Sequence, residues 1–138
     1  MREEPVRLTD VDARRLQGLV DGSRPRDLRD AGSVALLLRH MDDAEVLPAN
    51  RIDPDVVTMG SEVVVRDLDT HEVVIIRIVF PRSADAAAGK VSVLAPLGMA
   101  VLGRRVGDHV DWRTPGGLRR LRVDRVLYQP EREGKDLA

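Results

Sequence analysis

The sequence contains no cysteine and few aromatic residues, and both absences exclude kinds of chemistry. Without cysteine the chain has no disulfide, no thiolate nucleophile and no cysteine metal ligand. One Phe, one Trp and one Tyr among 138 residues are too few to stack a run of nucleic-acid bases. Lysine is scarce too. Only Lys90 and Lys135 among the 22 basic residues are lysines, so arginine, whose fork suits carboxylate or phosphate, carries most of the positive charge.

Long apolar runs are also missing. No stretch approaches the ~20 residues of a membrane span. Residues 1–5 carry charge where a signal peptide needs an apolar run. The net charge of -1 creates no global field that would select a nucleic acid or a membrane. We therefore expect a cytoplasmic protein.

Patterns typical of catalytic and metal sites are absent from the sequence. The histidines His40, His71 and His109 lie far apart, with no spacing that converges on an ion. No G-x-S-x-G nucleophile elbow, phosphate-binding loop or dinucleotide glycine fingerprint occurs. We interpret the histidines as surface residues and most carboxylates as solvated or helix-capping. The sequence predicts no enzymatic activity, no metal site and no cofactor.

The N-terminal part of the chain predicts two helices. Thr9 is a good N-cap, and Asp12 is an acidic capping partner three residues later. An apolar face follows as far as Gly22, which is a plausible stop. A second amphipathic helix is expected from about Asp27 to about Val46. Two apolar stripes joined by a short turn predict an antiparallel helical hairpin.

From Asp55 onward β-branched runs and turn residues replace the helical pattern. The run 72–80 is nearly continuous Val and Ile, as in a strand buried on both faces. A short helix is expected over 96–102, with proline at its start, and residues 114–117 have hairpin chemistry. The remaining expected strands cover residues 56–59, 62–66, 89–94, 110–112 and 118–128.

These elements together predict an α+β fold. A short antiparallel helical hairpin occupies residues 1–50. Residues 51–138 then form a mainly antiparallel sheet of five or six strands with one short helix. We expect the protein to be a monomer.

The terminal hairpin concentrates positive charge. Its arginines alternate with apolar residues such as Leu121 and Val123, which is typical of a strand with one solvated face. We favour this solvated face over nucleic-acid binding, since stacking aromatics are missing, although a protein partner could use the same surface. The cluster consists of Arg113, Arg119, Arg120, Arg122 and Arg125.

One segment resembles a known family. Residues 90–103 read Lys-Val-Ser-Val-Leu-Ala-Pro-Leu-Gly-Met-Ala-Val-Leu-Gly, which is similar to the signature of the Gre transcript-cleavage factors, and residues 104–108 continue the match. Ala95 stands where Gre factors usually have a second serine, and Ala-Pro there resembles the Rnk subgroup, the regulators of nucleoside diphosphate kinase. Further likeness to this subgroup lies at residues 55–59 with Ser61, 114–117 and 126–130.

This resemblance implies an FKBP-like C-terminal domain and docking on bacterial RNA polymerase, at the rim of its secondary channel. It implies a non-catalytic transcription regulator that competes with Gre-type factors, without sequence-specific nucleic-acid binding. The surface that meets the polymerase in Gre factors corresponds here to Asp85, Ser92, Pro96, Leu97 and Gly98.

The expected arm tip differs from that of Gre factors, where clustered acidic residues help to hold a catalytic magnesium ion in the polymerase. The tip here contains Asp21, Arg24, Arg26 and Asp27, and its arginines would oppose a cation. The first helix spans roughly 18 Å at 1.5 Å per residue, several turns less than a Gre arm. We therefore expect no stimulation of transcript cleavage.

Two alternatives stay open. The chain could be a cleavage cofactor that uses Asp21 and Asp27, or an FKBP-like interaction module for another protein, with the arginine hairpin as its surface. Prolyl isomerase activity is disfavoured because its pocket needs several aromatic rings. This chain offers only Phe80, Trp112 and Tyr128, and we expect Phe80 to belong to the core.

Overall fold

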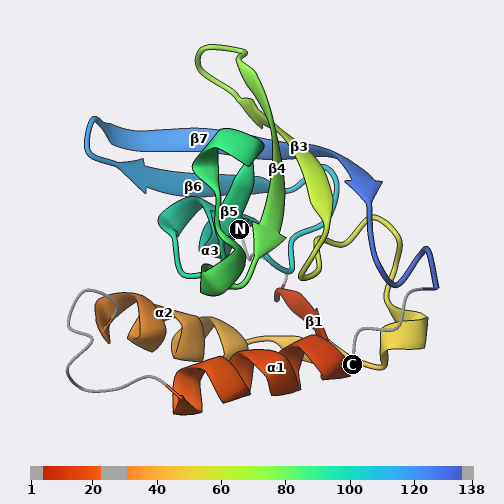
Figure 1. The fold of residues 1–138 in the computed structure, drawn as a ribbon. Coiled ribbons are helices and arrows are strands. Elements are labelled where there is room, and N and C mark those ends of the chain that lie inside the picture. The colour runs from red at the N-terminus through yellow and green to blue at the C-terminus, as the bar shows by residue number, and fades with distance from the viewer. Residues whose placement is uncertain (1–4, 23–30, 135–138) are drawn as a thin grey trace.

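A computed structural model describes residues 5–22 and 31–134 of the chain. Figure 1 shows a sheet domain above a pair of helices, and a short strand connects the two parts. The predicted α+β class is confirmed. The N-terminal elements are β1 (Arg7–Thr9), α1 (Asp10–Asp21), α2 (Ala31–Asp42), β2 (Glu45–Leu47) and the 3-10 turn η1 (Ala49–Arg51).

The main sheet has five strands in the order β5-β4-β3-β7-β6. Its pairs are antiparallel except for β4 and β5, which run parallel. The predicted hairpin at residues 114–117 is confirmed, since it joins β6 to β7. The elements are β3 (Glu62–Asp67), β4 (Val73–Val79), η2 (Pro81–Ser83), η3 (Ala86–Ala88), β5 (Lys90–Ser92), α3 (Pro96–Val101), β6 (His109–Thr114) and β7 (Gly117–Tyr128).

Helix α1 has the predicted N-cap, and α2 ends earlier than predicted. The hydroxyl of Thr9 accepts a hydrogen bond from the N–H of Asp12 at 3.0 Å. The expected start of the second helix near Asp27 lies outside the described residues. Its expected end near Val46 is wrong, because α2 stops at Asp42 and residues 45–47 form β2.

A small parallel sheet of β1 and β2 was not predicted, and it joins the helices to the sheet domain. The backbone N–H of Glu45 donates to Val6 at 2.8 Å, and that of Arg7 donates to Gly103 at 3.0 Å. Gly103 has a φ of 80°, and a Cβ there would lie 2.8 Å from the Cβ of Val6. Only glycine therefore fits this crossing without a shift of its neighbours.

Two strand predictions need correction. Residues 56–59 form no regular strand, because Val56 makes only one isolated bridge, to Arg105. Strand β4 is not buried on both faces, since residues 73–75 are 44%, 47% and 55% exposed. Only Ile76 and Ile78 of β4 enter the core, because its first half extends beyond the elements that cover the rest of the sheet.

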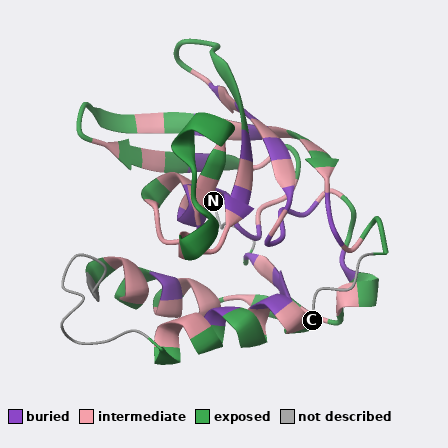
Figure 2. Ribbon diagram, viewed as in Figure 1, coloured by how far each residue is buried: buried purple, intermediate pink, exposed green. Residues whose placement is uncertain are grey.

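The apolar core is shared by the helices and the sheet. Leu16 of α1 and Leu37 of α2 belong to the same buried cluster as Val63, Val65 and Val123. Figure 2 shows buried residues on the strands and on the side of the helices that faces them. Among the described helices none is long and apolar enough to cross a membrane.

Candidate functional site

The residues expected to contact a partner gather where η3, β5 and α3 meet (Figure 1). Asp85 is exposed, and its backbone exchanges two hydrogen bonds of 2.9 Å with Lys90. Ser92 ends β5, and its hydroxyl accepts a hydrogen bond from the N–H of Leu94 at 3.0 Å. Its carbonyl accepts another from the N–H of Ala95 at 3.0 Å. Ser92 therefore fixes the turn that leads into α3.

The remaining expected contacts lie on α3 and differ in accessibility. Pro96 begins the helix and is exposed, whereas Leu97 is half-buried against the core. Gly98 is buried, and a Cβ on it would lie 2.2 Å from the carbonyl oxygen of Ser92. Such a distance is far inside van der Waals contact, so Gly98 allows α3 to pack on β5. The contact role of Gly98 stays a prediction, and its burial gives it a packing role as well.

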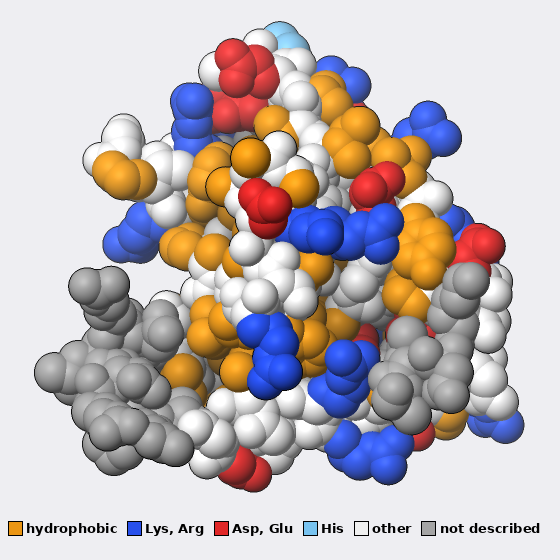
Figure 3. Space-filling view, in the orientation of Figure 1, with side chains coloured by type: hydrophobic (Ala, Val, Ile, Leu, Met, Phe, Trp, Pro, Cys, Tyr) orange, Lys and Arg blue, Asp and Glu red, His pale blue; other side chains and the backbone are white. Residues whose placement is uncertain are grey.

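Apolar surface adjoins this corner. Phe80, Leu94 and Leu97 are partly buried and pack against the core, so Phe80 contacts the core as expected but lies at its edge. The guanidinium of Arg15 lies 4.7 Å from the centroid of the Phe80 ring, which is a cation–π distance. Figure 3 shows hydrophobic side chains in the middle of this face, with basic side chains beside them. The corner thus combines apolar area with positive charge.

The expected arm tip is described only in part. Asp21 ends α1, is exposed, and accepts a hydrogen bond from the side-chain amide of Gln17 at 2.9 Å. Arg24, Arg26 and Asp27 lie outside the described residues. Helix α1 has 12 residues, in agreement with the short arm expected from the sequence.

Asp12 connects α1 to the segment before β3, a role that its capping position did not reveal. Its carboxylate is fully buried, and Oδ2 accepts a hydrogen bond from the N–H of Met59 at 3.0 Å. Its Oδ1 is buried without a hydrogen-bond partner among the described residues. Burial raises the pKa of Asp12 to about 7, although the Met59 bond opposes the rise, and the nearby charge of Glu131 adds to it.

Glu131 belongs to the same junction. Its Oε1 accepts a hydrogen bond from the Thr58 hydroxyl at 2.7 Å, and the hydroxyl oxygens of Thr58 and Ser61 are 2.9 Å apart. Its Oε2 is also buried and lacks a partner within the described part of the chain. Residues distant in sequence therefore meet here, which explains why no sequence motif identified them.

The histidines do not form a metal site. His40 is half-buried, which corrects its assignment to the surface, and its Nε2 lies 3.1 Å from the carbonyl oxygen of Leu102. Burial lowers the pKa of His40. His71 and His109 are exposed, as expected. Within residues 5–22 and 31–134 no group of three or more His, Asp or Glu side chains could hold a metal ion.

The arginines of the terminal hairpin lie largely in ion pairs on the solvent side. Arg119 is 3.3 Å from Asp67, and Arg120 is 3.0 Å from Asp69. Arg122 and Arg66 both bond to Asp124 at 2.8 Å. Burial raises the pKa of Asp124, but the hydrogen bonds from Arg122 and Arg66 outweigh it and lower the pKa overall. Arg113 and Arg125 are exposed and have no ion pair among the described residues.

Comparison with curated proteins gives matches along almost the whole chain. The chain is 35% identical over 135 residues to the "Regulator of nucleoside diphosphate kinase" of Escherichia coli (strain K12), covering 97% of both proteins. It is 34% identical over 116 residues to transcription elongation factor GreA of Rhodospirillum rubrum, covering 84% of this chain and 68% of that protein.

A solved structure agrees with these matches. The "Prokaryotic transcription elongation factor GreA/GreB from Nitrosomonas europaea" superposes with a TM-score of 0.72 and 34% identity, over 91% of this chain and 100% of that one. The family described as "Transcription elongation factor, GreA/GreB, C-term" matches residues 52–128, which include β3 to β7 and the Ser92–Pro96 turn. The resemblance seen in residues 90–108 is thereby confirmed, and the chain belongs to the GreA/GreB family.

Proposed function

We propose that this chain is a non-catalytic regulator of transcription that binds bacterial RNA polymerase at the rim of the secondary channel, in competition with Gre-type factors. We place it in the cytoplasm. The observation that carries the proposal is the similarity over 97% of both chains to a protein named as a regulator, together with family membership. The relative's name refers to nucleoside diphosphate kinase, but no feature of residues 5–22 and 31–134 indicates a surface for that enzyme.

The proposed docking surface is the corner of η3, β5 and α3. Asp85 and Pro96 are exposed there, and Leu97 adds partly buried apolar area. Ser92 and Gly98 hold the corner in shape through the turn hydrogen bond and the close packing of α3. A rigid turn that presents a few side chains suits docking, because little conformational freedom is lost on binding.

The absence of cleavage stimulation is the second part of the proposal. Hard carboxylate oxygens suit Mg²⁺, but Asp21 is the only carboxylate in the last turn of α1, and the tip beyond it also carries Arg24 and Arg26. A backtracked elongation complex tests this part. RNA cleavage faster than by polymerase alone would support the cofactor alternative, and its loss on changing both Asp21 and Asp27 to Ala would assign it to these acids.

Competition binding tests the docking. The labelled protein is titrated with core RNA polymerase, and a Gre factor is then added. We expect saturable binding that the Gre factor displaces. Asp85→Ala should weaken binding, and Asp111→Ala is the matched control, since it removes an exposed carboxylate from β6. Absence of binding, or equal effects of the two variants, contradicts the proposed surface and favours an interaction module for another protein.

A further inference from the structure

The outward face of the main sheet carries the arginines of β3 and β7. In β3, Val63 and Val65 are buried in the core, so the alternating residue Arg66 points to the other side. In β7, Leu121 and Val123 are buried, and Arg122 points outward beside Arg66, its register partner. The two guanidinium groups therefore stand on neighbouring strands of one open face.

Asp124 accepts hydrogen bonds from both of these arginines and fixes their orientation; this three-residue contact is called the arginine brace. Its Oδ2 accepts a hydrogen bond from Nε of Arg66 and its Oδ1 accepts one from Nε of Arg122, both at 2.8 Å. Because both arginines use Nε for the brace, the Nη groups of Arg122 stay without a partner among the described residues. Arg66 uses one Nη in a long bond of 3.4 Å to the carbonyl of His71. The carboxylate thus orients two guanidinium forks and leaves donors available.

A β-bulge adds a third cation to this face. Residues 122 and 125 are an odd number apart, so a regular strand would turn them to opposite faces. Val64 pairs with Arg125 and Val65 pairs with Val123, which makes Asp124 the extra residue of a bulge. The bulge places Arg125 on the same face of the sheet as Arg122. The two residues are about 10 Å apart along the strand, at 3.3–3.4 Å per residue.

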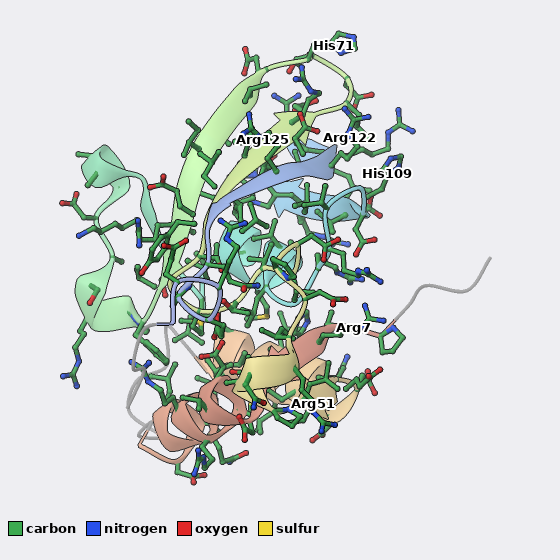
Figure 4. All side chains as sticks on the ribbon, turned by 90° about the vertical axis from the view of Figure 1, so that its right-hand side faces the viewer. Arg7, Arg51, His71, His109, Arg122 and Arg125 are labelled. Carbon is green, nitrogen blue, oxygen red and sulfur yellow. The ribbon has the colours of Figure 1, made fainter. Side chains whose placement is uncertain are left out.

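The three arginines surround a shallow hollow. The hollow has a volume of about 600 Å³ and is lined by Arg66, Arg122 and Arg125 together with Val64, Val106 and Val123. The three arginines outnumber the single carboxylate in the lining, that of Asp124. On β6, His109 pairs with Arg122. Figure 4 shows Arg122 and His109 at one end of the sheet and Arg125 further along β7.

We propose that this hollow binds the phosphodiester backbone of single-stranded nucleic acid, without reading its sequence. The separation of Arg125 from the braced pair favours a ligand with several spaced anionic groups over a single phosphate. Arginine forks match phosphate oxygens and stay charged at all physiological pH values. Val64 and Val106 can cover sugar carbons, and the lack of aromatic rings excludes base stacking.

An acidic protein segment fits this face less well. Protein interfaces are anchored by large apolar or aromatic side chains in a dry centre, and the apolar residues that line this hollow are valines. The inference does not depend on polymerase binding. The arginine face lies on β3 and β7, whereas η2 and η3 connect β4 to β5 at one edge of the sheet, on the left of Figure 4. Nucleic acid and polymerase could therefore be bound together.

Fluorescence anisotropy of the full chain with a labelled oligouridylate tests the proposal. The probe has about 20 nucleotides, more than the footprint of one single-strand binding domain. We expect binding that weakens with salt, with a slope of log K against log salt of roughly -2 for three phosphate contacts. The double variant Arg122→Gln with Arg125→Gln should bind roughly tenfold more weakly, as expected for two charge-assisted contacts on a surface.

The matched control is Arg82→Gln with Arg113→Gln, which removes the same charge from exposed arginines outside the hollow. Asp124→Asn tests whether binding depends on the orientation of Arg66 and Arg122 or only on the net charge of the hollow. It makes the chain more positive, yet we expect weaker binding, because the brace is lost. Thermal melting checks that each variant is folded.

Three results would overturn the proposal: no binding at low salt, an equal loss in the control double variant, or stronger binding by Asp124→Asn. Tighter binding of polyglutamate of similar length, with the same dependence on Arg122 and Arg125, would also overturn it and would indicate an acidic protein partner.

Discussion

Asp12 and Asp124 each join two parts of the fold, but their surroundings differ. Asp12 is buried between α1 and the segment before β3, where the backbone N–H of Met59 donates a hydrogen bond to it and the carboxylate of Glu131 lies nearby. Asp124 lies on the outer face of β7 between two guanidinium groups. Burial raises the pKa of Asp12 to about 7, whereas the arginines lower the pKa of Asp124.

The comparison shows that position in the fold, not residue type, decides the charge state. The junction is buried, and loss of solvation there favours a protonated carboxyl group. The outer sheet face supplies fixed cations and solvent, so it favours the carboxylate. Three substitutions can break or sharpen this contrast, and their expected effects decrease in the order given below.

Truncation of the core at the junction should have the largest effect. Leu16 is fully buried in α1, and Leu16→Ala should lower the free energy of unfolding by about 5 kcal/mol, the upper end for a leucine, from lost apolar burial and a cavity. The control is Leu118→Ala, since Leu118 on β7 is 57% exposed. Its truncation should lower the free energy of unfolding by less than about 0.5 kcal/mol. Urea unfolding followed by Trp112 fluorescence measures both. Equal effects would show that α1 does not share the core of the sheet.

Titration of Asp12 should have the next largest effect. Because the folded-state pKa is raised, the folded protein binds more protons than the unfolded chain, and stability falls as pH rises from about 4 to about 7. At 1.36 kcal/mol per pKa unit, a rise of this size changes the free energy of unfolding by at most about 4 kcal/mol. Asp12→Asn keeps an oxygen for the N–H of Met59 and should remove this part of the pH dependence.

Urea unfolding of Asp12→Asn and the unsubstituted chain across this pH range measures the effect. The difference between the two curves isolates Asp12, since His40 titrates in both. We expect the variant to gain stability relative to the unsubstituted chain as pH rises. Parallel curves would mean that the pKa of Asp12 is the same in the folded protein and in the unfolded chain.

Loss of the arginine brace should have the smallest effect on stability and the opposite pH dependence. Asp124→Asn removes two ion pairs, whose arginines are 35% and 41% exposed, so we expect a loss of about 1 kcal/mol after solvent screening. Because the folded-state pKa of Asp124 is lowered, this contribution is present above pH 4 and disappears as pH falls further. High salt should reduce the difference, whereas the effect of Asp12→Asn should persist.

Local signals in the sequence predicted the elements well where packing agreed with them. The Thr9 cap, the helix after Pro96 and the hairpin at residues 114–117 depend on neighbours within a few residues, and all three are confirmed. The end of α2 and residues 56–59 were predicted wrongly. In both segments, contacts with distant residues outweighed helix periodicity or β-branched composition, namely Val6 with Glu45 and Arg105 with Val56.

The sequence by itself determined the α+β class, the family and the absence of cysteine chemistry, because composition, short-range capping and a contiguous motif are all written along the chain. Only the tertiary structure decided the Asp12–Met59 junction and the Asp124 brace between Arg66 and Arg122. Asp12 and Met59 are 47 residues apart in the sequence, and Arg66 and Asp124 are 58 apart. A single β-bulge places Arg125 on the same face of the sheet as Arg122. Such contacts arise when separate strands and helices pack, so no local pattern could have revealed them.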